Sequence, residues 1–200
     1  MTNGIDVSDF QPGVSWQTVK EAGYSFAYCK ATEGTGYVAD TFAQNWRATR
    51  DAGILRGAYH FLHFDQDPTA QAEAFLATYS PSTGDLPPML DIETDAGLSV
   101  AQNVSCIATF TGIVEAKVKR KMQIYTYCSF WQQYLGDTDD FSGHPLWIAA
   151  YVPAPPPLPA AWTEWTVWQY ADDKEVPGAG AVDADLFNGN LDQLKGMCLP

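Results

Sequence analysis

The sequence predicts an α/β fold in which eight strands close into a barrel. Through the first two thirds of the chain, apolar β-rich runs alternate with helical patterns, as in β–α units around a parallel sheet. In the last third, three more strand-like runs are linked by segments such as Pro153–Pro157 that cannot form helices and that we expect to be surface loops. The 200 residues fit one domain near the lower size limit of (β/α)8 barrels, roughly 200 residues.

Eight strands are expected because each run is short, apolar and rich in β-branched or aromatic residues. In chain order they are Gly4–Val7, Ser25–Lys30, Arg56–Phe61, Pro88–Glu93, Met122–Tyr127, Leu146–Ala150, Thr166–Tyr170 and Ala181–Phe187.

Five helices are expected after the first five strands, namely Trp16–Ala22, Asp40–Ala52, Pro68–Tyr79, Val100–Val118 and Phe130–Leu135. The first two are followed by Gly23 and Gly53, which are suitable C-terminal caps. The third opens with Pro68 in its first turn, and Ser99 is a suitable N-cap for the fourth. These signals support helix boundaries at the same places.

Composition restricts the classes of function. The chain has 11 Lys and Arg against 24 Asp and Glu, a net charge of −13, so binding to a phosphate backbone is disfavoured and we expect no nucleic-acid partner. It contains no apolar run of about 18 residues and no export signal as given, so we expect no membrane partner. Its four cysteines have no C-x-x-C spacing, and we expect at least Cys29 to be a buried thiol.

Polar side chains follow many of the predicted strands where these end. Active sites of such barrels lie at the carboxyl ends of the strands. The strand-end candidates are Asp6, Lys30, Glu33, Tyr59, His60, Phe61, Asp91, Glu93, Tyr125, Tyr127, Trp147, Tyr151, Gln169, Tyr170, Asp183 and Asp185. They predict an acidic pocket rimmed by aromatic rings, which suits a sugar polymer: rings stack on pyranose faces and a protonated carboxyl can donate to a glycosidic oxygen.

The most specific element is Met89-Leu90-Asp91-Ile92-Glu93. Side chains alternate along a strand, so Asp91 and Glu93 share a face about 7 Å apart while Leu90 and Ile92 point at the helices. Two close carboxyls resist simultaneous ionisation. We expect Glu93 to be the general acid and Asp91 to stabilise the transition state or to orient the substrate's acetamido group.

These acidic residues and histidines also have alternative interpretations. Asp6 could merely begin a turn, although the strand-end rule favours a site role. Asp183 and Asp185 could bind calcium, but no loop of oxygen ligands accompanies them, so no metal site is expected. His60 and His63 are too few for zinc, and His60 is expected to pack or hydrogen-bond beneath the pocket.

With these residues in view, the chain resembles glycoside hydrolase family 25, the Chalaropsis-type lysozymes, nearly from end to end. Seven motifs in the family's order carry the resemblance: Gly4-Ile5-Asp6-Val7-Ser8, Lys30-Ala31-Thr32-Glu33-Gly34, Gly57-Ala58-Tyr59-His60-Phe61, Leu90-Asp91-Ile92-Glu93, Ile124-Tyr125-Thr126, Trp168-Gln169-Tyr170 and Val182-Asp183-Ala184-Asp185-Leu186-Phe187.

The resemblance implies an irregular, TIM-like (β/α)5(β)3 barrel that cleaves the β-1,4 bond between N-acetylmuramic acid and N-acetylglucosamine in bacterial peptidoglycan. It places the acid on Glu93, its partner on Asp91 and supporting carboxylates on Asp6 and Asp183. Tyr59, Tyr125, Trp147 and Tyr151 match the aromatic lining of the family's groove. With Phe61, Lys30 and Glu33 from the strand-end rule, these are the expected substrate-binding residues.

Residues 1–200 are expected to be one catalytic barrel without a separate wall-binding module, monomeric and without a cofactor. Its partner is expected to be the glycan strands of peptidoglycan. It is expected outside the cell, or as a phage endolysin that reaches the wall after release. Two departures from the family pattern are Cys29 and Cys128, which stand where aliphatic or small residues are expected. A carbohydrate-binding protein without catalysis and a chitinase-like hydrolase are the rival functions.

Overall fold

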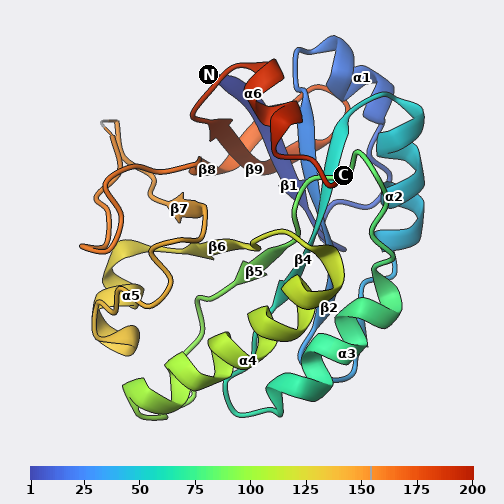
Figure 1. Ribbon diagram of the computed structural model, residues 1–200. Helices are drawn as coiled ribbons and strands as arrows, with labels where there is room; N and C mark the ends of the chain where they lie inside the picture. Colours follow the sequence, from blue (N-terminus) through green and yellow to red (C-terminus); the bar gives the residue numbers. More distant parts are fainter. Residues whose placement is uncertain (154) are drawn as a thin grey trace.

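The computed structural model describes residues 1–153 and 155–200, which form a barrel of strands wrapped by helices (Figure 1). The strands are β1 (Thr2–Val7), β2 (Phe26–Glu33), β3 (Tyr37–Val38), β4 (Leu55–Phe61), β5 (Met89–Asp91), β6 (Gln123–Thr126), β7 (Leu146–Ala149), β8 (Val167–Val176) and β9 (Gly180–Phe187). The helices are α1 (Trp16–Glu21), α2 (Phe42–Asp51), α3 (Pro68–Thr78), α4 (Val100–Val118), α5 (Cys128–Leu135) and α6 (Leu191–Gly196).

The barrel closes between the first and last strands. Within the described residues the strand order is β1-β9-β8-β7-β6-β5-β4-β2-β3, and β1 also pairs with β2. Eight strands therefore form the closed barrel, and β3 is a short hairpin partner of β2. The predicted eight-stranded α/β barrel is confirmed, while β3 and α6 are elements that the sequence pattern did not indicate.

The last strand runs against its neighbours. β9 is antiparallel to both β8 and β1, because a tight hairpin joins β8 directly to β9. Gly178 and Gly180 take positive φ angles of 90° and 77° in that hairpin, a conformation that glycine adopts without steric cost. No helix is needed between these strands, which explains how a barrel closes in so short a chain.

Alternation along the strands separates two cores. Residues such as Ile5, Leu90 and Ile92 point outward into the large core between the barrel and the helices. Aromatic residues, including Tyr28 and Trp147, point inward and fill the barrel. Gly57 makes room for one of them, because a Cβ atom there would lie 2.1 Å from the Tyr28 ring.

The helix signals are also confirmed. Gly23 and Gly53 follow α1 and α2 with positive φ angles, and Pro68 stands in the first turn of α3. Ser99 and Gln102 form a capping box at the start of α4. These contacts satisfy backbone groups that a helix end leaves without partners.

Cys29 is a buried free thiol, as predicted, and the other three cysteines are also free. Of the Pro153–Pro157 segment, residue 154 lies outside the described residues, and Pro153 and Pro155 are exposed. Within the described part of the chain, no helix is both long and apolar enough to cross a membrane.

Candidate active site

A pocket of about 260 Å³ opens at the carboxyl ends of the parallel strands. It is lined by Asp6, Ser8, Phe10, Lys30, Tyr59, Phe61, Met89, Asp91, Glu93, Tyr125, Tyr151, Gln169 and Asp183. All four carboxylates predicted as catalytic therefore meet in one pocket, together with five of the seven predicted substrate-binding residues.

Asp91 and Glu93 owe their position to strand alternation. Leu90 and Ile92 are fully buried in the outer core, which turns the two carboxyls toward the pocket. Asp91 ends β5 and is only 6% exposed, and its Oδ1 has no hydrogen-bond partner among the described residues. Glu93 lies beyond the end of the strand and is partly exposed. The longer side chain is thus nearer the mouth of the pocket.

Asp6 and Asp183 face each other across β1 and β9. The register pairs Asp6 with Asp183, although Asp183 lies in the first half of its strand. Because β9 runs antiparallel, its early residues reach the same end of the barrel as the last residues of β1. The two acidic side chains are thereby held in contact.

A hydrogen-bond network centred on Gln169 links three strands at the pocket. The Gln169 Nε2 donates to Asp6 Oδ2 at 2.8 Å. The hydroxyls of Tyr125 and Tyr151 both donate to Gln169 Oε1 at 2.9 Å. The amide orientation is therefore determined, since its oxygen faces two donors and its nitrogen faces a carboxylate. Gln169 holds two aromatic walls and one carboxyl in place.

Burial dominates the electrostatics of the four carboxyls. It raises the pKa of Asp6 and Asp91 well above the usual range, and neighbouring carboxylates raise both further. Burial also raises the pKa of Glu93, which the positive charge of Lys30 partly offsets. The pKa of Asp183 rises to about 6, chiefly through burial. The pocket therefore retains protons at pH values where isolated carboxyls are ionised.

These raised pKa values predict a stability effect. The folded protein keeps the proton of Asp183 between about pH 4 and about pH 6, where the unfolded chain has lost it, so stability decreases as pH rises through this window. We expect Asp183→Asn to be more stable than the parent at pH 7 by on the order of 1 kcal/mol, with a smaller difference at pH 4. Urea denaturation of both proteins at the two pH values measures this, and an equal difference at both would contradict it.

Glu33 lies beside the pocket rather than in its wall. Its carboxylate contacts Lys30 Nζ at 2.5 Å and His63 Nε2 at 2.9 Å. Although burial opposes it, these two contacts lower the pKa of Glu33. Lys30 in turn lies 4.8 Å from the Phe61 ring centre. Glu33 thus holds Lys30 in the pocket.

One predicted wall residue is wrong. Trp147 is fully buried inside the barrel, where its ring packs edge-on against Tyr28 at a centroid distance of 4.7 Å. A ring without exposed surface cannot stack on a sugar. Asp185 is also fully buried and lies deeper than Asp183, paired with Gly4.

His60 packs as expected and takes no part in the pocket wall. It stacks on Phe110 at a centroid distance of 4.7 Å and contacts Thr32 and Gln71 through its two nitrogens. Burial lowers its pKa to about 4.

Ser8, Phe10, Met89 and Gln169 line the pocket without having been assigned a role from the sequence. Gln169 was named as a strand end, and Ser8 and Phe10 directly follow β1. The rule that strand ends and the loops after them build the site could have found all three.

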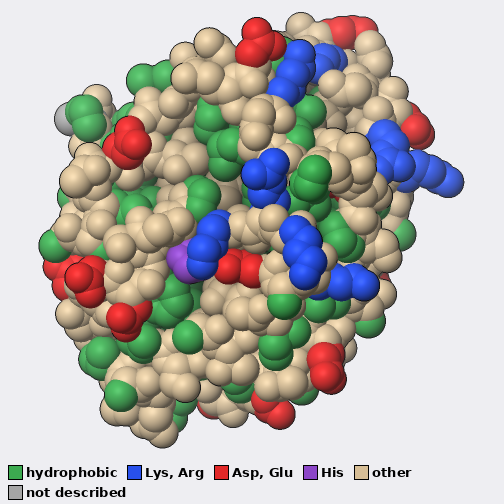
Figure 2. All heavy atoms as spheres, in the orientation of Figure 1, with side chains coloured by type: hydrophobic (Ala, Val, Ile, Leu, Met, Phe, Trp, Pro, Cys, Tyr) green, Lys and Arg blue, Asp and Glu red, His purple; other side chains and the backbone are tan. Residues whose placement is uncertain are grey.

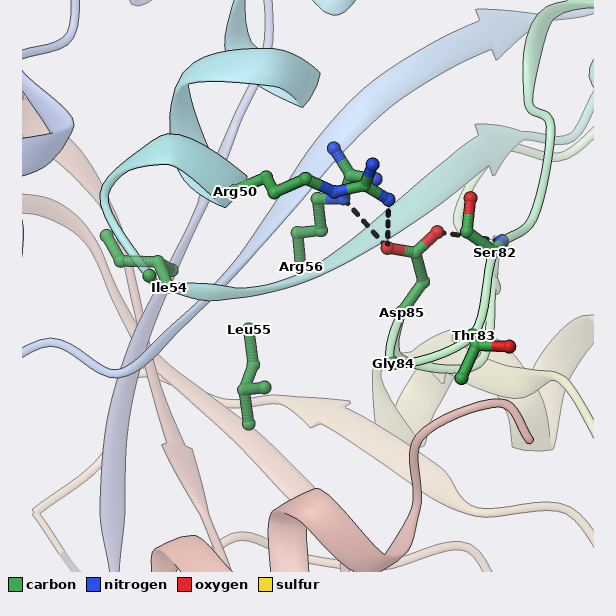
Figure 3. Close-up of a pocket in the computed structure, with 9 residues that line it drawn as sticks. Arg50, Ile54, Leu55, Arg56, Ser82, Thr83, Gly84 and Asp85 are labelled. Atoms are coloured by element: carbon green, nitrogen blue, oxygen red, sulfur yellow. Dashed lines mark hydrogen bonds and ion pairs between the residues drawn. The ribbon is translucent and has the colours of Figure 1, made fainter.

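The largest pocket described, about 520 Å³, lies at the opposite end of the barrel where β4 begins (Figure 3). There Arg56 Nε donates to Asp85 Oδ1 at 2.8 Å, and Asp85 Oδ2 accepts from the Ser82 N–H at 2.9 Å. The Asp85 carboxylate is thereby paired with an arginine and a backbone amide. Lys and Arg side chains gather on the face that carries the C-terminus (Figure 2). The four carboxyls predicted as catalytic lie in the pocket at the other end of the barrel.

An eight-stranded α/β barrel with four carboxyls and several aromatic rings at one mouth is an arrangement typical of glycoside hydrolases. Residues 5–179 match the model of glycosyl hydrolases family 25, and the chain belongs to this family. It is 39% identical to Lysozyme M1 of Streptomyces globisporus, over 96% of this chain and 69% of that one. It is 35% identical to the N,O-diacetylmuramidase of Chalaropsis sp., over 96% of each chain.

The fold agrees with that assignment. The bacterial lysozyme of Streptomyces coelicolor superposes with a TM-score of 0.94 at 38% identity, covering 98% of this chain and 96% of that one. The resemblance inferred from seven short motifs is confirmed.

Proposed function

We propose that this chain is a muramidase that hydrolyses the β-1,4 bond between N-acetylmuramic acid and N-acetylglucosamine in bacterial peptidoglycan. The observation that carries the proposal is the convergence of Asp6, Asp91, Glu93 and Asp183 in a pocket walled by Tyr59, Tyr125 and Tyr151. The family and the names of its relatives support the substrate class.

In this proposal Glu93 is the general acid. It donates its proton to the glycosidic oxygen as the bond from that oxygen to the anomeric carbon of the muramic acid residue breaks. Water finally adds to the anomeric carbon, and its proton returns to the Glu93 carboxylate. We assign this role to Glu93 because it extends beyond β5 toward the mouth, and because burial raises its pKa and so favours the protonated form.

Asp91 supports the positive charge that develops on the sugar. It does so either directly or by orienting the substrate's acetamido group for internal attack on the anomeric carbon. Its deep burial and its Oδ1 without a partner suit both roles. A cationic sugar or an amide N–H beside Asp91 lowers the pKa of its buried carboxyl, since either favours the ionised form.

Asp6 and Asp183 are proposed to support the pair from the neighbouring strands. Burial raises the pKa of both, so they add less negative charge to the pocket than two free carboxylates would. Gln169 keeps Asp6 in place through its amide.

The chemistry of the released ends tests the function. Purified sacculi are digested, the products are reduced with borohydride, and mass spectrometry identifies the reduced sugar. We expect muramitol, because a muramidase leaves muramic acid at the new reducing end. Glucosaminitol would indicate a glucosaminidase, and absence of products would indicate a binding protein. Cleavage of chitin oligomers in preference to sacculi would indicate a chitinase-like enzyme. Any of these three results overturns the proposal.

The proposed partner is the glycan strand itself, bound by one barrel acting as a monomer. Because peptidoglycan lies outside the cytoplasmic membrane, the proposed place of action is extracellular, reached by secretion or by release as a phage endolysin. Size-exclusion chromatography with light scattering tests the monomer, and a dimer mass would contradict it.

A further inference from the structure

Large apolar side chains are exposed on two sides of the acidic pocket. Phe10, which follows β1, is 90% exposed although it lines the pocket. Tyr127 and Tyr151, which follow β6 and β7, are 37% and 52% exposed. In the circular strand order β1 and β6 stand opposite each other. The carboxyls therefore lie between two exposed aromatic walls.

On the side of Tyr127 and Tyr151, a groove continues from the acidic pocket. A second pocket of about 350 Å³ is lined by these tyrosines, Ala149 and Ala150, and it shares Glu93, Tyr125 and Tyr151 with the acidic pocket. A linear polymer that crosses the acidic pocket and follows this groove would leave the mouth on the other side over Phe10.

The turn that carries Phe10 is held rigidly. The Phe10 N–H donates to Ser8 Oγ at 3.3 Å, and the Ser8 N–H donates to Gln11 Oε1 at 3.0 Å. The Gln11 N–H closes the turn on the Ser8 carbonyl at 3.2 Å. The backbone is thus fixed directly before and after the phenylalanine.

Asp9 ties the same turn to the start of α2. Its carboxylate accepts from the Thr41 N–H at 2.8 Å and the Asp40 N–H at 3.0 Å, and it also accepts from the Tyr37 hydroxyl. Although burial opposes it, these hydrogen bonds lower the pKa of Asp9 to about 2. The carboxylate therefore stays ionised and keeps these bonds at any ordinary pH. Tyr37, itself 43% exposed, is thereby held beside the Phe10 turn.

We propose that Phe10, with Tyr37 at its edge, is a stacking platform for a sugar ring of the glycan strand beyond the two rings at the cleaved bond. The inference rests on the proposed function. An exposed ring on a fixed turn stacks on the apolar face of a pyranose at a reduced entropic cost, because the backbone of the turn does not have to be ordered on binding. The uncharged face of a sugar also suits a wall whose neighbouring pocket is acidic.

The test compares glycan length. Phe10→Ala and Phe10→Tyr are assayed on a short and a long soluble oligomer of alternating N-acetylglucosamine and N-acetylmuramic acid. For Phe10→Ala we expect KM to rise roughly 3- to 10-fold more for the long oligomer than for the short one, since only the long one reaches the platform. Phe10→Tyr keeps an aromatic face and should restore the parent's preference for length.

Val100→Ala is the matched control, because Val100 is an exposed apolar residue on α4 outside both pockets. It should leave activity on both oligomers unchanged. Equal losses for Phe10→Ala on both lengths, or no loss on the long oligomer, would overturn the platform.

Failure of the platform is separable from failure of the muramidase proposal. Equilibrium binding of the long oligomer is measured in a Glu93→Gln background, with and without Phe10→Ala. Weaker binding of the double variant supports the platform whatever bond the parent enzyme cleaves. Equal binding overturns it even where the parent releases muramic acid ends.

Discussion

Glu93→Gln is expected to lower kcat by roughly 10²- to 10⁴-fold, the usual contribution of a general acid. The amide has nearly the shape of the acid but cannot deliver a proton to the leaving oxygen. Glycan binding and the fold should be retained, since Glu93 is partly exposed at the mouth and its burial opposes its charge. The rate of release of reducing ends from a soluble glycan, with thermal unfolding on the same sample, measures both expectations.

Glu73→Gln is the matched control for this experiment. Glu73 is an exposed residue on α3 and does not line the acidic pocket, so the same chemical change there should leave kcat within about 2-fold of the parent. Turnover of Glu93→Gln close to that of Glu73→Gln would remove Glu93 from the acid role and leave Asp91 as the remaining acid on β5.

Much of the fold follows from patterns that are local in the sequence. Alternation predicts that Leu90 and Ile92 enter the outer core and that Asp91 faces inward, because successive side chains of a strand point to opposite faces. Capping residues such as Ser99 are equally local, since the side chain bonds to a backbone group three residues away. The pairing of β9 with β1 is different. The hairpin from β8 sets the direction of β9 locally, but its pairing with β1 joins the two ends of the chain, and no local pattern encodes it.

The site was predictable in its composition and less so in its depth. Alternation says whether a side chain points into the barrel, but its height along the barrel axis depends on strand tilt and stagger. Trp147 and Tyr151 show the difference: Trp147 lies fully buried in the barrel, whereas Tyr151 reaches the mouth. The link from Tyr125 and Tyr151 through Gln169 to Asp6 joins residues far apart in sequence, so no local pattern encodes it.

Asp85→Ala is expected to destabilise the protein by about 3–5 kcal/mol, because it leaves the buried charge of Arg56 without its partner. The two side chains are only 4% and 5% exposed, and the Arg56 guanidinium is held above the Trp46 ring at 3.9 Å (Figure 3 shows the ion pair). Urea denaturation measures the free energy of unfolding. The pair lies at the end of the barrel away from the carboxyls, so kcat per folded molecule should stay at the parent's value.

Two further variants separate the buried pair from ordinary surface charge. Arg50 also approaches Asp85, but at 3.8 Å and with 57% of its side chain exposed, so Arg50→Ala should cost less than about 1 kcal/mol. Adding Arg56→Met to Asp85→Ala removes the unpaired charge and should recover part of the loss. If Asp85→Ala costs no more than Arg50→Ala, the Asp85 carboxylate is not what compensates Arg56. If the double variant is no more stable than Asp85→Ala, the loss of stability arises from the Asp85 bond to the Ser82 amide rather than from an Arg56 charge left without its partner.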